Sequence, residues 1–283
     1  MYKSHFSKSN FVGMVVALGM MKASTVGVIH ALTKPFSRTL SSRGRASTLT
    51  GFKSLLSALK ELDTACLCDA DKSCIGNKGY EGIKLMGTSI RPVNFSQQKH
   101  VVMAGVARTV QCTDKDDFFA VLRGMEEAHP GDVLLVDTLS STRAVAGELF
   151  CSEAQRKGVV GIVIDGPIRD TAQLENLFVR CYATSTTPYS GTIQSIGKMQ
   201  ATIRCCGVEV DPGDIVVGDN DGIIVGKMET FRQLLPIAQT IHLTEGRVRQ
   251  AISEGTKLAD MTNYEEHLKY RKAGKESSLA FRT

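Results

Sequence analysis

The middle of this chain alternates short apolar runs with stretches of helical character, and this alternation restricts the fold more than any other feature. Apolar runs at 101–107, 133–136 and 159–164 have the length of buried strands. Between them, 116–128 has amphipathic helical spacing and about 146–157 forms a second helical stretch. Strands and helices in this succession predict a mixed α/β domain, rather than an all-α or all-β fold.

Turn residues mark where these elements end. Pro130 and Gly131 end the first helix, and Gly158 occupies the position after the second helix where a left-handed residue is favoured. The third strand ends in the segment 165–170, which we predict to be a tight, charged Gly/Pro turn. Further strands are expected at 177–179 and 208–210.

A long helix is expected from near Glu229 to about Gly255. Counted at 100° per residue, one narrow stripe carries its apolar side chains, and Glu245 lies at the edge of that stripe. Glu245 either has a function there or pairs with Arg247 or Arg249 at the surface. The expected stripe consists of Ile237, Ile241, Val248 and Ile252.

Charge is distributed unevenly along the sequence. Residues 1–60 contain nine Lys and Arg and no Asp or Glu, which leaves 25 basic and 29 acidic residues in the rest. A basic, Ser- and Thr-rich start without acids is typical of a mitochondrial transit peptide, with a cytoplasmic protein as the alternative. The apolar run 11–21 is too short to span a bilayer, so no membrane segment is expected.

These observations predict three parts: a targeting leader over 1–60, a folded domain over 61–262 and a charged, poorly ordered tail over 263–283. The basic excess lies in the leader, and the body is slightly acidic. A nucleic-acid-binding domain carries its basic residues on the folded part, so we expect no nucleic-acid partner.

Eight cysteines are present, and the folded part is long enough to bury a core without disulfides. The pairs Cys66-x-Cys68 and Cys205-Cys206 lack the CxxC spacing of structural zinc sites. We expect these thiols to be reduced and mostly buried.

Two neighbouring residues, Arg169 and Asp170, are the first candidates for chemistry. They follow a predicted strand, and ligands of open α/β sheets gather at the carboxyl ends of strands. An Arg fork suits a carboxylate or keto acid, and a single carboxylate among waters suits Mg²⁺. The same pair could instead be a structural ion pair that stabilises the turn.

The segment Gly147-Glu148-Leu149-Phe150 is the second candidate, because it should open a helix whose free N–H groups can bind an anion. Glu148 is either a base that holds a water or a charge favoured by the helix dipole. Nucleotide-binding and nucleophile-elbow motifs do not occur in the sequence.

Four segments together resemble the RraA-like and 4-hydroxy-4-methyl-2-oxoglutarate aldolase family. The resemblance covers roughly residues 61–261 and is strongest in the middle. Each segment is weak alone, but the four in this order are specific. They are Gly131 to Asp137, Ala146 to Leu149, Gly158 to Asp170 and Gly213 to Gly222.

The resemblance implies a compact swivelling β/β/α domain in a homotrimer, or a hexamer made of two trimers, with active sites between subunits. It implies a metal-dependent aldolase that releases pyruvate from 4-hydroxy-4-methyl-2-oxoglutarate or 4-carboxy-4-hydroxy-2-oxoadipate, with oxaloacetate decarboxylation as a side activity. The substrate is thus a small 2-oxo acid, and the cofactor is Mg²⁺ or Mn²⁺.

Carried onto this sequence, the resemblance implies that Asp170 binds the metal and Arg169 holds the pyruvyl unit. The backbone of Gly147, Glu148, Leu149 and Phe150 resembles the carboxylate cradle. Glu148 and, by position, Glu245 resemble the family's carboxylates that handle a water.

The same family includes non-catalytic proteins that bind and inhibit a ribonuclease by protein contact, which is the alternative function. The retained Arg169 and Asp170 favour an enzyme, whereas a silent scaffold would bind no divalent metal. The loop 138–142 lacks the glycines common in the family and leaves the substrate open.

Overall fold

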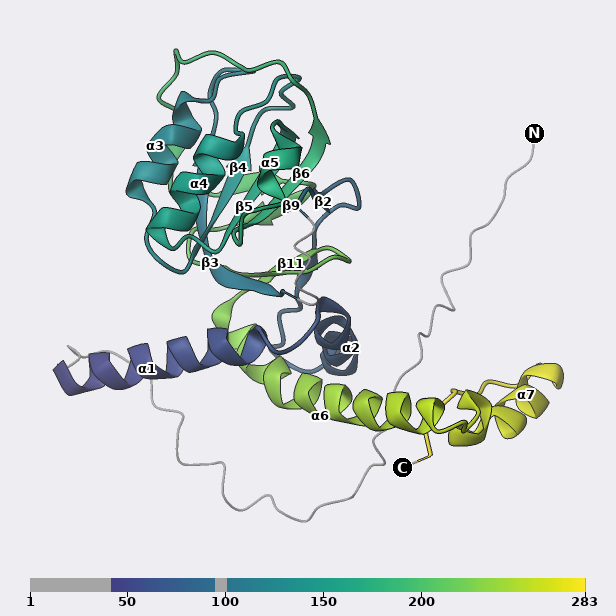
Figure 1. Cartoon of the computed structure of the whole chain (residues 1–283). Coiled ribbons are helices and arrows are strands. Elements are labelled where there is room, and N and C mark those ends of the chain that lie inside the picture. The colour runs from purple at the N-terminus through teal and green to yellow at the C-terminus, as the bar shows by residue number, and fades with distance from the viewer. Residues whose placement is uncertain (1–41, 95–100, 283) are drawn as a thin grey trace, which may run out of the picture. The chain divides into compact units, whose positions relative to one another are not determined.

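The computed structural model describes residues 42–94 and 101–282 (Figure 1). Residues 47–239 form one compact unit, and 240–282 belong, with 42–46, to a second unit. The part of the leader before residue 42 lies outside the described residues.

The first unit is built around a mixed nine-stranded sheet with the order β1-β11-β10-β3-β4-β5-β6-β2, in which β7 also pairs with β3. The central strands β3, β4, β5 and β6 are parallel, and the flanking pairs are antiparallel. Strands β8 and β9 form a separate hairpin. The bounds are β1 Lys84–Leu85, β2 Arg91–Pro92, β3 Met103–Gln111, β4 Asp132–Asp137, β5 Gly161–Ile168, β6 Arg180–Thr186, β7 Lys198–Met199, β8 Ile203–Cys205, β9 Val208–Val210, β10 Ile215–Gly218 and β11 Ile223–Gly226.

Seven α-helices and a short 3₁₀ helix, η1, are found among the described residues. They are α1 Ser42–Leu59, α2 Thr64–Cys74, α3 Phe119–Glu127, α4 Glu148–Lys157, α5 Thr171–Leu174, α6 Met228–Ser253, α7 Tyr264–Lys272 and η1 Leu258–Met261. The succession β3, α3, β4, α4, β5 confirms the expected α/β fold. Gly158 ends α4 with φ of +76°, as its place in the sequence predicted.

Alternate side chains of the parallel strands bury the two faces of the sheet in separate clusters. Leu134 and Ile164 pack toward α3 and α4, which cover one face (Figure 1). Leu135 and Val163 pack on the other face, in a cluster that includes residues of the β8–β9 hairpin. With both faces covered, the central strands read as nearly continuous apolar runs in the sequence.

Two expectations about this sheet are wrong. Residues 165–168 continue β5 with a register irregularity between Ile164 and Pro167, so the expected tight turn is a bulged strand end. Residues 177–179 precede β6 and are not a strand. Pairing with β5 begins at Arg180 and fixes where β6 starts. The apolar run 177–179 by itself does not indicate which strand β6 pairs with.

Helical structure extends beyond the predicted 61–262 domain at both ends. Leu55 and Leu59, four residues apart on α1, are buried, so the folded part begins within the segment interpreted as the leader. α7 lies within the expected tail, and Thr262 bridges to Phe281 near the end of the chain. No helix of the described residues is long and apolar enough to cross a membrane.

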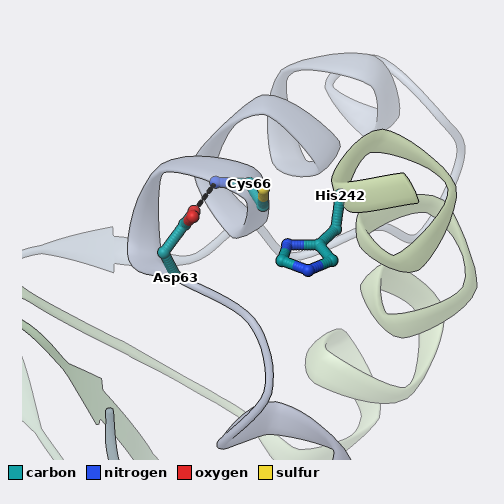
Figure 2. A group of neighbouring side chains, drawn as sticks. All are labelled: Asp63, Cys66 and His242. Atoms are coloured by element: carbon teal, nitrogen blue, oxygen red, sulfur yellow. Dashed lines mark hydrogen bonds between the residues drawn. The ribbon is translucent and has the colours of Figure 1, made fainter. Parts of the chain in front are cut away.

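The start of α2 is fixed by a side-chain cap. The Asp63 carboxylate accepts a hydrogen bond from the Cys66 backbone N–H at 2.7 Å (Figure 2). This satisfies one of the N–H groups that a helix start leaves without an intrahelical partner.

The expected C-terminal helix is confirmed as α6, and it contains Pro236. Its apolar stripe is only partly as expected. Ile241 is buried, but Ile252 is 47% exposed. The other buried apolar side chains of α6 are Phe231, Leu234 and Ala238.

Candidate functional site

The start of α4 and the end of β5 meet at the carboxyl edge of the parallel strands. The Arg169 N–H donates to the Ala146 carbonyl at 3.2 Å, and the Glu148 N–H donates to Asp170 Oδ2 at 3.3 Å. These two bonds join segments that lie about two dozen residues apart in the sequence. The residues predicted separately as an Arg–Asp pair and as a helix-start cradle therefore form one group.

Gly147 makes this close approach possible. It is the residue before α4 and has extended backbone angles that any residue can adopt. A Cβ at this position would overlap Asp170 Oδ2 and would lie 2.9 Å from Arg169 Cγ. The glycine is thus required for space, because the Arg169 and Asp170 side chains lie directly against the backbone of the helix start.

Asp170 is held in an uncommon backbone conformation, with φ of 61° and ψ of 37°. Non-glycine residues in this left-handed region are uncommon and are often found at ligand sites. Its Oδ2 lies 3.4 Å from Arg169 Nε, and both side chains are about 40% exposed. A pair this open to water contributes little to stability, so the geometry is better explained by a ligand than by the ion pair.

A pocket lies at this pair and has both polar and apolar lining residues. Arg169, Asp170 and Ser190 are the polar ones, and the others form an apolar wall. The wall includes Phe118 and Phe150, whose rings meet edge to face with centroids 5.9 Å apart. The pocket suits a small acid with an apolar portion.

The Asp170 carboxylate in this pocket fits a hard divalent cation. Among the described residues, Asp170 Oδ1 and the Nη atoms of Arg169 make no hydrogen bond, so both groups can take a ligand from the pocket. Mg²⁺ commonly keeps several waters and uses one or two carboxylates together with its substrate. A single exposed carboxylate beside an arginine is sufficient for that arrangement.

Glu148 on α4 and the thiols of Cys151 and Cys181 lie close to this group in the fold. The Ser152 hydroxyl donates to Glu148 Oε1 at 2.5 Å, which orients the carboxylate along the helix. Cys181 Sγ donates to Cys151 Sγ at 3.3 Å, and this bond, with burial, raises the pKa of the Cys151 thiol well above its usual range. Both thiols are buried, and the pair links α4 to β6.

Glu245 lies apart from this group in the chain, in the C-terminal unit on α6. Arg249 Nη1 donates to its Oε2 at 3.3 Å, which is the surface pair that the sequence left as an alternative. Its part in the chemistry stays a prediction.

Sequence reasoning missed two residues that order the segments next to the pocket-lining residues Ala144 and Ser190. Asp116 Oδ1 accepts hydrogen bonds from the Ser141 hydroxyl at 2.7 Å and from the Thr142 N–H at 2.7 Å. The Ser141 bond and the backbone bonds lower the pKa of Asp116. Asp117 holds the segment around Ser190 through Thr192. Both aspartates follow a strand, but nothing local in the sequence identifies their partners.

The fold and the site define an α/β protein with a glycine cradle and an Arg–Asp pair at the carboxyl edge of its sheet. The RraA-like family model, described as Aldolase/RraA, matches residues 64–225, more than half of the chain. The chain belongs to the RraA-like family, and the expected membership is confirmed.

Three relatives illustrate the similarity. A protein of Halalkalibacterium halodurans, provisionally named a 4-hydroxy-4-methyl-2-oxoglutarate aldolase, is 34% identical over 171 residues, which cover 60% of this chain and 75% of that protein. A Thermus thermophilus protein named 4-hydroxy-4-methyl-2-oxoglutarate aldolase is 32% identical over 123 residues, covering 43% and 74%. The structure of Streptomyces coelicolor RraAS2, described as an unusual member of the RNase ES inhibitor RraA family, has a TM-score of 0.57 at 25% identity, covering 76% and 99%.

Proposed function

We propose that this protein is a divalent-metal-dependent aldolase that releases pyruvate from 4-hydroxy-4-methyl-2-oxoglutarate or a related 4-hydroxy-2-oxo acid, with oxaloacetate decarboxylation as a side activity. The observation that supports this most is the approach of Arg169 and Asp170 to the bare backbone of Gly147. The aldolase names of two relatives support the same reaction class.

Asp170 is the residue that would hold Mg²⁺ or Mn²⁺, through the oxygen that no described residue occupies. The cation, when bound, supplies Lewis-acid stabilisation of the negative charge that develops on the keto oxygen. The left-handed backbone of Asp170 fixes the direction in which the carboxylate leaves the end of β5.

Arg169 binds the substrate by charge and shape. Its guanidinium presents planar donors to a carboxylate or to a developing oxyanion, and its position is fixed by the backbone bond to Ala146. The backbone N–H groups at the start of α4 offer a second contact for the substrate carboxylate.

Proton transfer is assigned to Glu148, with Glu245 as the second carboxylate. Glu148 is oriented by Ser152 and half-buried, so it can hold a water beside the reacting carbon. That water would take the proton of the substrate hydroxyl and return one to the pyruvate methyl. The assembly that would bring Glu245 to a site is a homotrimer or a pair of trimers. The proposed location is mitochondrial, with the cytoplasm as the alternative.

The test measures pyruvate release by the full-length chain from 4-hydroxy-4-methyl-2-oxoglutarate and from oxaloacetate, with Mg²⁺, with Mn²⁺ and with EDTA. Activity that needs metal and is lost in Asp170→Asn supports the proposal. Glu175→Gln is the control, because Glu175 is an exposed acid at the end of α5. Activity that EDTA does not change would overturn the metal assignment.

A ribonuclease-binding function is the second candidate, supported by the likeness to the Streptomyces coelicolor protein. Leu149 and Tyr189 are 74% and 68% exposed, and apolar side chains of this kind are frequent at protein contacts. Inhibition of a ribonuclease by protein that is silent on both substrates would favour this candidate.

A further inference from the structure

A second group of metal-ligating side chains lies in the same unit, on the sheet face away from α3 and α4. Asp165 lies on β5, and its carboxylate reaches the turn of the β8–β9 hairpin, where it accepts a hydrogen bond from the Cys206 N–H. A carboxylate oxygen of Asp165 and the sulfurs of Cys205 and Cys206 lie within 4.8 Å of one another. None of these residues takes part in the proposed aldolase chemistry.

The turn of the hairpin explains why two consecutive cysteines can face one point. Cys205 pairs with Val208, so Cys206 and Gly207 alone form the connection, with φ of 47° and 83°. Consecutive side chains in a strand point to opposite faces, and the left-handed turn at Cys206 interrupts that alternation. A turn of this type favours Asn or Gly at the position that Cys206 occupies.

The backbone around the cluster is anchored on two sides. The Cys206 N–H donates to Asp165 Oδ2 at 2.7 Å, and the Gly87 N–H donates to the Cys206 carbonyl at 2.8 Å. Among the described residues, Asp165 Oδ1 accepts no hydrogen bond. One carboxylate oxygen thus fixes the turn while the other can take a ligand.

Access and charge are suited to a cation. Cys205 is fully buried and Cys206 is 7% exposed, whereas Asp165 is half-buried, so the cluster opens to solvent on the Asp165 side. Asp137 is the register partner of Asp165 on β4 and adds a second carboxylate nearby. Arg and Lys side chains make no hydrogen bond to Asp165 among the described residues.

We propose that Asp165, Cys205 and Cys206 bind a thiophilic divalent ion such as Zn²⁺ at a second site, distinct from the site at Asp170. Two sulfurs and a carboxylate oxygen leave one position of a tetrahedron for water. Soft sulfur ligands select against Mg²⁺, which prefers an all-oxygen set, so the two sites discriminate between metals. Each cysteine loses its proton to solvent when its sulfur binds the ion.

The experiment titrates Cd²⁺ into the reduced, metal-free, full-length chain and records thiolate-to-metal charge-transfer absorption. We expect one Cd²⁺ per chain at this site, and displacement by Zn²⁺. Cys205→Ser and Cys206→Ser should abolish the band. Asp165→Asn keeps an oxygen for the Cys206 N–H and should weaken binding about tenfold or more.

Two control variants separate this site from other groups. Cys181→Ser removes a buried thiol elsewhere, and Asp170→Asn removes the proposed magnesium ligand, so both should keep the band. Because absorption does not depend on turnover, this experiment tests the second site independently of the aldolase proposal.

X-ray absorption of the Zn²⁺-loaded wild-type chain tests the ligand set without relying on a variant that must fold. The expected shell contains two sulfurs at about 2.3 Å and two oxygens. A shell of nitrogen and oxygen alone would overturn the proposal. A band that survives in both Ser variants, or that is lost in Cys181→Ser, would do the same.

Discussion

Two carboxylates five residues apart near the end of β5 lie in different surroundings. Asp170 is exposed, has left-handed backbone angles and lies beside Arg169 and the bare backbone of Gly147. Asp165 is half-buried, lies in the strand and binds a turn that carries two buried thiols.

The register of β5 with β6 shifts between Ile164 and Pro167, a stretch that contains Asp165. Asp165 still pairs with Asp137 on β4, whereas Asp170 lies beyond the strand, immediately before α5. Under the two proposals, this strand end carries one exposed carboxylate at Asp170 and one half-buried carboxylate beside two buried sulfurs at Asp165. The neighbours of a carboxylate decide which ion it suits.

The largest effect is expected from Asp170→Asn. Asn tolerates left-handed angles better than Ala, so the fold should be retained while the proposed metal ligand is lost. Loss of several kcal/mol of Lewis-acid stabilisation corresponds to about a thousandfold lower kcat/KM for pyruvate release. Cd²⁺ binding at Asp165 should not change. Loss of both functions together would show that the two sites are coupled.

Arg169→Lys should lower kcat/KM about a hundredfold, because Lys keeps the charge but loses the planar donor fork. The melting temperature should change little, since the side chain is about 40% exposed. Steady-state kinetics with 4-hydroxy-4-methyl-2-oxoglutarate give the measurement. Wild-type kinetics in this variant would contradict a role for Arg169 in substrate binding. Asp170 would then be the remaining residue of the pair with a proposed role.

Gly147→Ala should disturb the site at Arg169 and Asp170 by steric overlap. The added methyl meets Arg169 and Asp170, and overpacking of this kind costs about 1–3 kcal/mol of stability. Pyruvate release should fall about tenfold or more as the Arg–Asp pair moves away. Gly246→Ala is the matched control, because a Cβ there meets no atom within 4 Å. Equal melting temperatures and activities for the two variants would contradict the close approach.

The smallest effect on activity is expected from Asp117→Asn. This variant tests how the stability of the pocket side of the unit depends on pH. Burial alone would raise the pKa of Asp117, but hydrogen bonds from Gln194, Thr192 and others lower it overall. The ionised form therefore stabilises the fold above about pH 4, and that contribution is lost as the pH falls through the lowered pKa.

The variant should lose about 1.5–3 kcal/mol of unfolding free energy at pH 7 and show a flatter decline in acid. Chemical denaturation from pH 7 down to about pH 3 measures both. Asp117 holds the segment that carries Ser190 at the pocket. Acid should therefore destabilise this segment at a higher pH than the segment that carries Cys205 and Cys206. Parallel pH curves for the variant and the wild type would remove Asp117 as the cause.

Local patterns were sufficient for most elements around the Arg–Asp site, although residues 165–168 were predicted as a turn and belong to β5. The apolar run at 133–136, the glycine stop at Gly158 and the order of strands and helices follow from short-range preferences, and each is confirmed. The helix start at Gly147 and the Arg169–Asp170 pair were predicted separately, and the structure shows that they are in contact. Residue type made Arg169 and Asp170 candidates for a ligand site, their roles come from the resemblance to the family, and those roles stay predictions.

Contacts between distant segments decided the rest. The sequence alone indicated reduced, mostly buried thiols, and all eight cysteines are free, seven of them buried and Cys68 half-buried. It could not indicate that the Cys206 N–H binds Asp165, because 41 residues separate them and only the sheet brings them together. The start of β6 and the inclusion of α1 in the folded part were also missed. Periodicity reports which side chains are buried, whereas the partner that buries them is set by the packing of the whole unit.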